Sequence, residues 1–196
     1  FDNCVYTRAE VIRLAKKGFE LAMTRSKKLC CVDKANVLET SRLWRETVQA
    51  MEKDYPEVTV SYEFVDAVAM RLVQWPNSYD VLITENLFGD ILTDEASVIS
   101  GSMGLMPSAS LGLKIGLFEP IHGSYPQATG LNIANPMATI LSAAMMFENF
   151  GLQEEGKAIR AVVNDALNEG IVTEDLADGG KAYGTKEVGD WLAKNV

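Results

Sequence analysis

The apolar positions along this chain follow two patterns, and together they predict an alternation of helices and strands. In the first pattern apolar residues recur every three or four positions, which is typical of a helix with one buried face. In the second pattern a few apolar or β-branched residues follow one another, which is typical of a short strand. The first pattern predicts helices at 8–27, 43–51, 65–73, 90–99, 136–150, 153–169 and 185–194, and the second predicts strands at 29–32, 58–62 and 79–84.

The order of these segments predicts the fold class. Up to about residue 100 the strands and helices alternate, and a helix is the usual connection between neighbouring parallel strands. From 101 to 135 glycine and proline recur and interrupt every long periodicity, so we expect loops and turns there. We therefore predict an α/β lobe at 1–100 and part of a second lobe at 101–196.

The composition narrows the classes of function. The chain has 196 residues, of which 47% are apolar and 23% are charged, as in ordinary globular proteins. A formal net charge of -9 opposes the attraction to phosphate on which most nucleic-acid binding depends, so we expect no nucleic-acid partner. No apolar stretch approaches the length of a membrane span, so we expect no membrane partner and a cytoplasmic location.

The cysteines and the first residues give two smaller expectations. Cys30 and Cys31 are neighbours in a predicted strand, so their side chains should point to opposite faces, and a disulfide framework is not expected. The chain begins at Phe1 rather than at a methionine, and residues 1–6 have extended character without an evident partner strand. We expect further sequence upstream.

Asp90 and Asp94 are the first candidate for chemistry. They are four residues apart near the start of a predicted helix, so both carboxylates should lie on one face of it. Two carboxylates at that spacing can hold one Mg²⁺ or Mn²⁺. The alternatives are a solvated acidic face and a pair of acids that complements the N-terminal end of the helix dipole.

Lys34 and Asp66 are the second candidate. Each follows a predicted strand, so both should lie at the carboxyl edge of the parallel sheet, where open α/β sheets bind their ligands. A lysine beside a divalent cation can act as a general base, because like charge disfavours the ammonium form. The alternative is an ordinary surface ion pair.

Residues 119–136 are the third candidate. This stretch contains glycines that permit close backbone approach, small polar side chains and the only histidine of the chain. It could hold a nucleotide, although it lacks the G-x-G-x-x-G fingerprint of a Rossmann fold. The alternative is an irregular surface loop.

Taken in order, these segments resemble one family. The segment at 86–95, Asn-Leu-Phe-Gly-Asp-Ile-Leu-Thr-Asp-Glu, is typical of the isocitrate/isopropylmalate dehydrogenase family of β-decarboxylating dehydrogenases. The segments at 34–38 and 43–46, Lys-Ala-Asn-Val-Leu and Leu-Trp-Arg-Glu, favour its isopropylmalate branch. Further similar segments lie at 32–33, 107–110, 119–124 and 132–136, so the resemblance covers essentially the whole chain, as a C-terminal portion of such an enzyme.

The resemblance implies a fold and a division of labour between its parts. We expect a parallel-rich mixed α/β sheet flanked by helices, in an incomplete two-lobed unit. Residues 1–100 would form the metal-binding and dimerisation lobe, and residues 101–196 the C-terminal part of the nucleotide-binding lobe.

The resemblance also implies a homodimer with shared active sites. Asp90 and Asp94 of one subunit, with Asp66 of the partner subunit, would hold Mg²⁺ or Mn²⁺. Lys34, also reaching across from the partner, would take the proton of the substrate hydroxyl. Tyr6 would protonate the enol that remains after CO₂ is lost.

The remaining implied contacts concern substrate and NAD. Lys34, Asp66 and Val37 would contact the substrate, with Val37 facing its isopropyl group, and Asn36 would lie near the nicotinamide. Gln127 replaces an aspartate that is common in the NAD-dependent members. A neutral glutamine would repel the 2′-phosphate of NADP less than an aspartate does, so the preference for NAD over NADP would be less secure. The adenosine half of NAD would be surrounded by His122, Gly123, Ser124, Gln127 and Asn135.

The implied reaction is the oxidative decarboxylation of (2R,3S)-3-isopropylmalate to 2-oxoisocaproate with reduction of NAD, in leucine biosynthesis. Within the family the alternatives are dehydrogenases of tartrate, malate or homoisocitrate. From another class, the alternative is a catalytically incomplete fragment that acts only in dimerisation. The family keeps its substrate-clamping arginines upstream of the position matching Phe1, so we expect this chain alone to be inactive.

Overall fold

The computed structural model describes all 196 residues, and the chain divides into two compact units, Phe1–Ala96 and Ser97–Val196. None of its helices combines the length and the apolar composition that a membrane span requires. The metal-binding, dimerisation and nucleotide-binding roles of the two units stay predictions.

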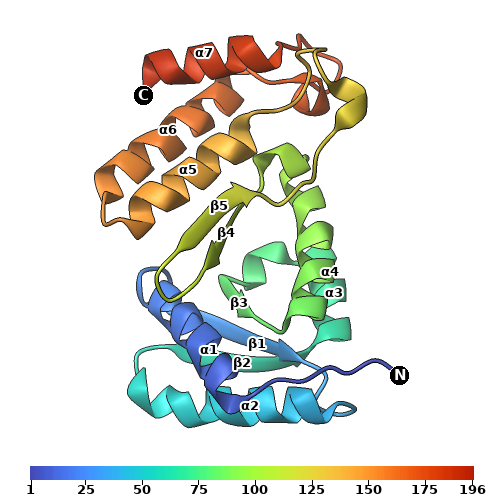
Figure 1. Ribbon diagram of the computed structural model, residues 1–196, viewed down its shortest axis with the longest axis vertical. Coiled ribbons are helices and arrows are strands. Elements are labelled where there is room, and N and C mark those ends of the chain that lie inside the picture. Colours follow the sequence, from blue (N-terminus) through green and yellow to red (C-terminus); the bar gives the residue numbers. More distant parts are fainter. The chain divides into compact units, whose positions relative to one another are not determined.

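A three-stranded parallel sheet forms the centre of the first unit (Figure 1). Strand β1 (Lys28–Asp33) lies between β2 (Thr59–Phe64) and β3 (Val81–Ile83), and both neighbours run parallel to it. The predicted parallel α/β layer is confirmed. Its helices are α1 (Arg8–Met23), α2 (Glu39–Met51), α3 (Val65–Gln74) and α4 (Asn86–Ser97).

Alternate residues of β1 belong to different cores. Leu29 and Cys31 pack with α1 and α2, whereas Cys30 and Val32 pack with α3 and α4. This follows from the two-residue period of a strand, and it confirms that the adjacent cysteines face opposite sides. All three cysteines are free thiols. The sheet is therefore covered on both faces, as parallel sheets usually are.

The start of α1 agrees with the sequence, and its end does not. The capping box at Thr7 is present: the Thr7 hydroxyl accepts from the Glu10 amide at 3.4 Å, and the Glu10 carboxylate accepts from the Thr7 amide at 2.7 Å. The predicted extension to residue 27 is wrong, because the helix ends at Met23. Lys27 has a positive φ of 60°, which lies outside the right-handed helical region, so the helix cannot include it.

Helix α4 begins four residues earlier than predicted, at Asn86 rather than at residue 90. The Glu85 carboxylate accepts from the amides of Leu87 at 3.0 Å and Phe88 at 3.1 Å, so it satisfies two of the unpaired donors at the helix start. Asp90 therefore lies beyond the first turn. A complement to the helix dipole no longer accounts for it, because that effect fades within the first turn.

The second unit combines an antiparallel hairpin with three helices. The hairpin pairs β4 (Pro107–Leu111) with β5 (Gly116–Pro120), in a segment for which only loops and turns were predicted. That prediction was wrong because its signals were weak: the strands are short, and they contain small residues and glycine. The two prolines pair with each other at the end of the ladder, where proline is tolerated.

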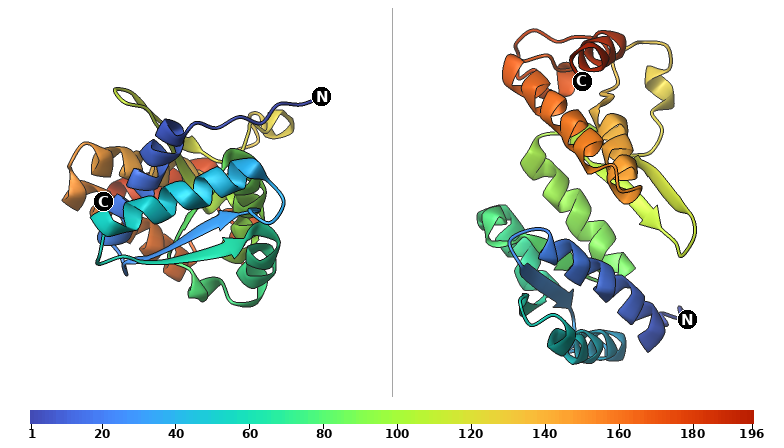
Figure 2. Two further views of the ribbon diagram at one scale, coloured as in Figure 1. Left: turned by 90° about the horizontal axis from the view of Figure 1, so that it is seen from below. Right: turned by 90° about the vertical axis from the view of Figure 1, so that its left-hand side faces the viewer.

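Helices α5 (Met137–Asn149), α6 (Gln153–Glu169) and α7 (Thr185–Asn195) complete the second unit. Figures 1 and 2 show α5 and α6 side by side, with the hairpin against α5. All three helices lie within about one residue of their predicted bounds. Buried residues of these helices and of the loop after α6 form one core, which contains Met137, Val162, Val163, Ala166, Val172, Val188 and Leu192.

Candidate active site

Lys34 and Asp66 lie together at the carboxyl edge of the parallel sheet. Asp33 and Phe64 are paired in the last register position of β1 and β2; Lys34 follows Asp33 directly, and Asp66 lies two residues after Phe64, in the first turn of α3. The Lys34 ammonium donates to the Asp66 carboxylate, and this hydrogen bond holds the pKa of Asp66 below its usual value. Both side chains reach solvent, so the pair is available to a ligand.

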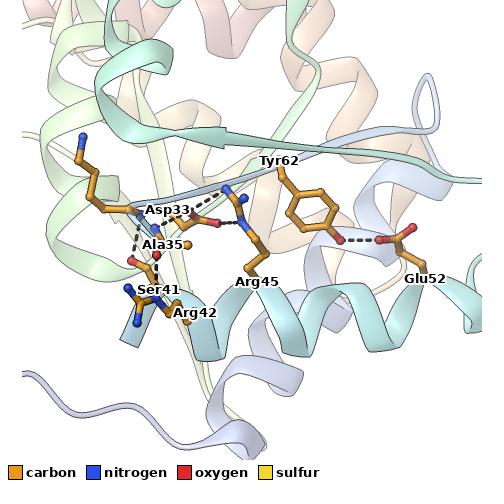
Figure 3. A network of polar contacts seen from close by, with 8 residues as sticks. Asp33, Ala35, Ser41, Arg42, Arg45, Glu52 and Tyr62 are labelled. Atoms are coloured by element: carbon orange, nitrogen blue, oxygen red, sulfur yellow. Dashed lines mark hydrogen bonds and ion pairs between the residues drawn. The ribbon is translucent and has the colours of Figure 1, made fainter. Parts of the chain in front are cut away.

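A buried ion pair lies beneath Lys34, and the sequence did not predict it. The carboxylate of Asp33 is 1% exposed, and it accepts from Arg45 Nε at 2.8 Å and from Arg45 Nη2 at 3.0 Å (Figure 3). The guanidinium carbon of Arg45 also lies 5.6 Å from the centroid of the Tyr62 ring and 5.1 Å from that of Phe64. Such a bidentate pair, set against aromatic rings, fixes both partners in position.

The turn after β1 carries three of the predicted site residues, Lys34, Asn36 and Val37. Its backbone is held at both ends, because the Lys34 carbonyl accepts from the amides of Val37 and Leu38, each at 2.9 Å. Asn36 is exposed, and Val37 is 62% exposed. An apolar side chain with that exposure on a fixed turn is open to contact with a ligand.

Asp90 and Asp94 lie one turn apart on α4, and both are exposed. The structure therefore brings the two carboxylates to one face, as predicted. No group of three or more acidic, histidine or cysteine side chains that could hold a metal ion lies together in this chain. The third predicted ligand, Asp66, is accordingly not beside them within one chain.

Tyr6 has a partner that the sequence did not reveal. Its hydroxyl donates to the Glu85 carboxylate at 2.8 Å, and its ring packs edge-on against Trp44 at 5.8 Å between centroids. Burial, and next the hydrogen bond to Glu85, raise the pKa of Tyr6. Because Glu85 also caps α4, this contact ties the first residues of the chain to that helix. The proton-donor role of Tyr6 stays a prediction.

A cavity of about 880 Å³ lies within the second unit, and four of the predicted NAD-binding residues line it. Asn135 is fixed there, since its side-chain oxygen accepts from the Met137 amide at 2.9 Å. A Cβ added to Gly123 would meet nothing within 4 Å, so the backbone there is open to a ligand. The predicted residues that line the cavity are His122, Gly123, Ser124 and Asn135.

Asp175 is a cavity residue that sequence reasoning missed. Its carboxylate accepts from Asn135 Nδ2 at 3.0 Å and from the hydroxyls of Ser102 and Thr173. Burial alone would raise the pKa of Asp175, but these three hydrogen bonds outweigh burial and lower it. Asp175 therefore stays ionised at neutral pH and fixes the amide of Asn135. Its separation from Asn135 by 40 residues gave no local signal in the sequence.

Gln127 lies outside the residues that line this cavity. It is exposed in a short 3-10 turn, Pro126–Ala128, while its neighbours Tyr125 and Ala128 do line the cavity. A direct contact between Gln127 and the adenosine ribose stays a prediction.

The comparison with known families decides what this arrangement is. A family described as isocitrate/isopropylmalate dehydrogenase matches residues 1–192. The chain belongs to the isocitrate/isopropylmalate dehydrogenase family. The family resemblance inferred from the sequence is thereby confirmed.

The curated relatives and the solved structures agree with this family. The 3-isopropylmalate dehydrogenase of Bacteroides fragilis is 58% identical over 197 residues, which cover 100% of this chain and 56% of the relative. The 3-isopropylmalate dehydrogenase of Oceanobacillus iheyensis is 54% identical over 198 residues, with 100% and 54% covered. The chain thus spans about half the length of these relatives.

Two crystal structures share the fold. An isocitrate dehydrogenase from Methylococcus capsulatus aligns with a TM-score of 0.92 and 36% identity, over 98% of this chain and 57% of that one. A β-decarboxylating dehydrogenase from Thermococcus kodakarensis aligns with a TM-score of 0.89 and 38% identity, over 100% and 57%. The predicted fold class is confirmed.

Proposed function

We propose that the complete protein that contains this chain catalyses the oxidative decarboxylation of (2R,3S)-3-isopropylmalate to 2-oxoisocaproate with reduction of NAD, in leucine biosynthesis. The observation that carries this proposal is the pairing at the sheet edge of Lys34, on its fixed turn, with Asp66 of α3. The names of the curated relatives support the choice of substrate.

The acidic residues fit a divalent cation that is shared between two subunits. Asp90 and Asp94 supply hard oxygen donors from one helix face, which suits Mg²⁺ or Mn²⁺. Two carboxylates leave most coordination positions of such an ion open. In the proposed dimer Asp66 of the partner subunit supplies a third carboxylate, and the substrate and water supply the rest. When bound, the cation polarises the substrate hydroxyl and stabilises negative charge on its oxygen.

Exposed apolar side chains beside these acids support the proposed dimer. Leu87, Ile91 and Asp94 are spaced four and three residues apart on α4, so they lie on one face of the helix. Leu87 is 62% exposed and Ile91 is 58% exposed. An exposed apolar stripe that ends at Asp94, a proposed metal ligand, fits a subunit interface that borders a metal site.

Lys34 acts as the general base in this proposal. Its ammonium donates to Asp66 in the free chain. In the proposed dimer Asp66 would help to hold the cation, and Lys34 Nζ would accept the proton of the substrate hydroxyl. Val37 gives the isopropyl group of the substrate an apolar contact from the same turn.

The cavity of the second unit takes the adenosine half of NAD. Its lining is mainly apolar, with an amide, hydroxyl groups and two carboxylates that can hydrogen-bond a neutral base and ribose. The Asn135 amide donates to Asp175 and accepts from the Met137 amide, so its remaining N–H is presented in a fixed orientation. When bound, NAD accepts the hydride from the substrate.

The direct test is NADH formation by the complete protein with Mn²⁺, NAD and one substrate at a time. We expect 3-isopropylmalate to be oxidised faster than malate, tartrate or homoisocitrate. If one of the other three were oxidised faster, the proposed reaction type would hold but the proposed substrate would be wrong. Inactivity with all four would remove the proposed function.

Metal binding has a readout of its own in thermal unfolding. At a Mn²⁺ concentration of 100 Kd we expect about 2.7 kcal/mol of stabilisation, because the ion binds the native state only. Asp90→Asn should abolish this gain. Asp165→Asn, which changes an exposed acid on α6, is the matched control and should retain it. A folded wild-type dimer that gains no stability from Mn²⁺ would contradict the metal site and favour the dimerisation module.

A further inference from the structure

The turn that carries Lys34 is attached to α2 by side chains that no step of the proposed reaction uses. Asp33, at the end of β1, accepts both from Arg45 and from the Ala35 amide at 2.8 Å. Ser41 Oγ accepts from the Lys34 amide at 3.0 Å. The Ala35 carbonyl accepts from Arg42 Nε at 2.9 Å. Figure 3 shows these contacts converging on the turn from α2.

The buried position of this network distinguishes it from an ordinary surface ion pair. Asp33 and Ser41 are each 1% exposed, so neither can exchange its partner for water. A buried carboxylate is tolerated only when its charge is paired and its lone pairs are satisfied. Arg45 supplies that charge from one side, and the Ala35 amide supplies a further donor from the turn itself.

Arg45 is in turn fixed by elements other than the turn. Its guanidinium lies against the rings of Tyr62 and Phe64 on β2. The Tyr62 hydroxyl donates to the Glu52 carboxylate at 2.6 Å, at the end of α2, which holds that ring in place. The Phe64 ring also lies 5.8 Å from Lys34 Nζ. The position of Arg45 is therefore linked both to the backbone of the turn and to the surroundings of the lysine head group.

We propose that Arg45, acting through Asp33, is a positioning residue that fixes the turn of Lys34, Asn36 and Val37 for reaction. This inference rests on the proposed function of Lys34. The bidentate fork of Arg45 sets the rotamer of Asp33, and Asp33 then sets the backbone of the turn through the Ala35 amide. A small displacement of the turn would move the base and the apolar substrate contact together.

Arg45→Lys is the primary test in the complete protein, because it keeps the positive charge and removes the fork. We expect kcat with 3-isopropylmalate to fall about 100-fold, as a misplacement of about 1 Å can cause, while KM changes by less than about threefold. Hydrogen exchange at the Ala35 amide should accelerate by about tenfold or more, while the Val48 amide in α2 keeps its protection.

Arg160→Lys is the matched control. Arg160 donates to Glu148 from Nε at 2.7 Å and from Nη2 at 3.0 Å, so it makes the same fork between α5 and α6 of the second unit. Its replacement should lower stability without changing kcat. Equal losses of kcat in the two variants, or an unchanged kcat in Arg45→Lys despite faster exchange at Ala35, would overturn the positioning role.

Ser41→Ala keeps the proposal testable where Arg45→Lys fails to fold. It removes only the acceptor of the Lys34 amide and leaves the Asp33–Arg45 pair intact. We expect faster exchange at that amide and a kcat reduced about tenfold or less, with an unchanged KM. Faster exchange at Lys34 with an unchanged kcat would show that the position of the turn does not control the rate, and would contradict the proposal. If the wild-type protein oxidised no candidate substrate, the proposed function would fail, and the exchange data alone would decide whether the network holds the turn.

Discussion

The two candidate regions of this chain are built in different ways. At the sheet edge of the first unit, charged groups hold each other, as Lys34 does with Asp66 and Arg45 with Asp33. In the cavity of the second unit most of the lining is apolar, and one of its two carboxylates, Asp175, fixes the amide of Asn135. Proton transfer needs charges in fixed places, whereas a nucleoside is recognised by shape and by neutral hydrogen bonds. Substitutions at the edge should therefore change kcat, and substitutions in the cavity should change KM for NAD.

Lys34→Met should have the largest effect and tests the first half of the comparison. A positioned general base contributes about 10²–10⁴-fold to a rate, so we expect kcat of the complete protein to fall in that range. KM for NAD should not change. Lys157→Met, on an exposed face of α6, is the control and should leave kcat unaltered. A drop in kcat of less than about fivefold for Lys34→Met would remove the base assignment.

Asn135→Ala tests the second half. The loss of one neutral hydrogen bond to the nucleoside corresponds to about 0.5–1.5 kcal/mol, so KM for NAD should rise up to about tenfold. The value of kcat at saturating NAD should not change. Steady-state kinetics with varied NAD give both values, with Gln153→Ala as the matched amide deletion on α6. A fall in kcat at an unchanged KM would show that the two regions do not divide the work in this way.

Tyr6→Phe separates structure from chemistry at the sheet edge. The substitution removes the hydrogen bond to Glu85 while the ring keeps its contact with Trp44. A purely structural role predicts a loss of about 0.5–1.5 kcal/mol in the free energy of unfolding and little change in kcat. Denaturant unfolding and turnover on the same preparation measure both. A loss of kcat of about 100-fold or more at unchanged stability would instead support the proton-donor role.

Asp80→Asn should have the smallest effect and concerns the opposite edge of the same sheet. Hydrogen bonds from the Ser26 hydroxyl and from Arg25, followed by the Ser26 amide, lower the pKa of Asp80 to about 2. Because the folded pKa lies below the unfolded value, the ionised carboxylate stabilises the fold above about pH 4, and this stabilisation is lost as the pH falls toward 2. Thermal unfolding should show the variant less stable at pH 7 and equal to the wild type near pH 2. A constant difference across that range would contradict this assignment.

Much of the fold could be predicted because its signals are local. The parallel sheet follows from short apolar runs separated by helical patterns, and α6 has its predicted bounds, 153–169. The hairpin β4–β5 was missed because its residues are small and its stability comes from packing against α5 rather than from strand propensity. The start of α4 was missed because the Glu85 side chain caps it, and nothing in the sequence indicated that Glu85 belongs to the helix start rather than to the preceding loop.

The candidate site was only partly accessible from the sequence, for a related reason. Lys34, Asp66, Asp90 and Asp94 could be found because strand ends and helical spacing place them. Their supporting partners could not, because Arg45, Glu85 and Asp175 act through contacts with residues distant in sequence. One signal was present for the Asp33–Arg45 pair. An aspartate that ends a buried strand requires a cationic partner, and Arg45 lies on the next helix.

Within one chain the acids form two separate groups. Asp90 and Asp94 lie on α4, Lys34 and Asp66 lie at the sheet edge, and the two groups do not form one site. In the proposed dimer each active site takes one group from each of two subunits.

Mixing two inactive variants of the complete protein tests this inference most directly. Lys34→Met and Asp90→Asn each damage a different group, so a mixed dimer contains one intact site and one site with both defects. After subunit exchange in equal amounts, half of the dimers should be mixed, and activity should recover to about a quarter of the wild-type value. Activity that stays at the level of the separate variants, in a sample in which mixed dimers are demonstrated, would contradict a site shared between subunits.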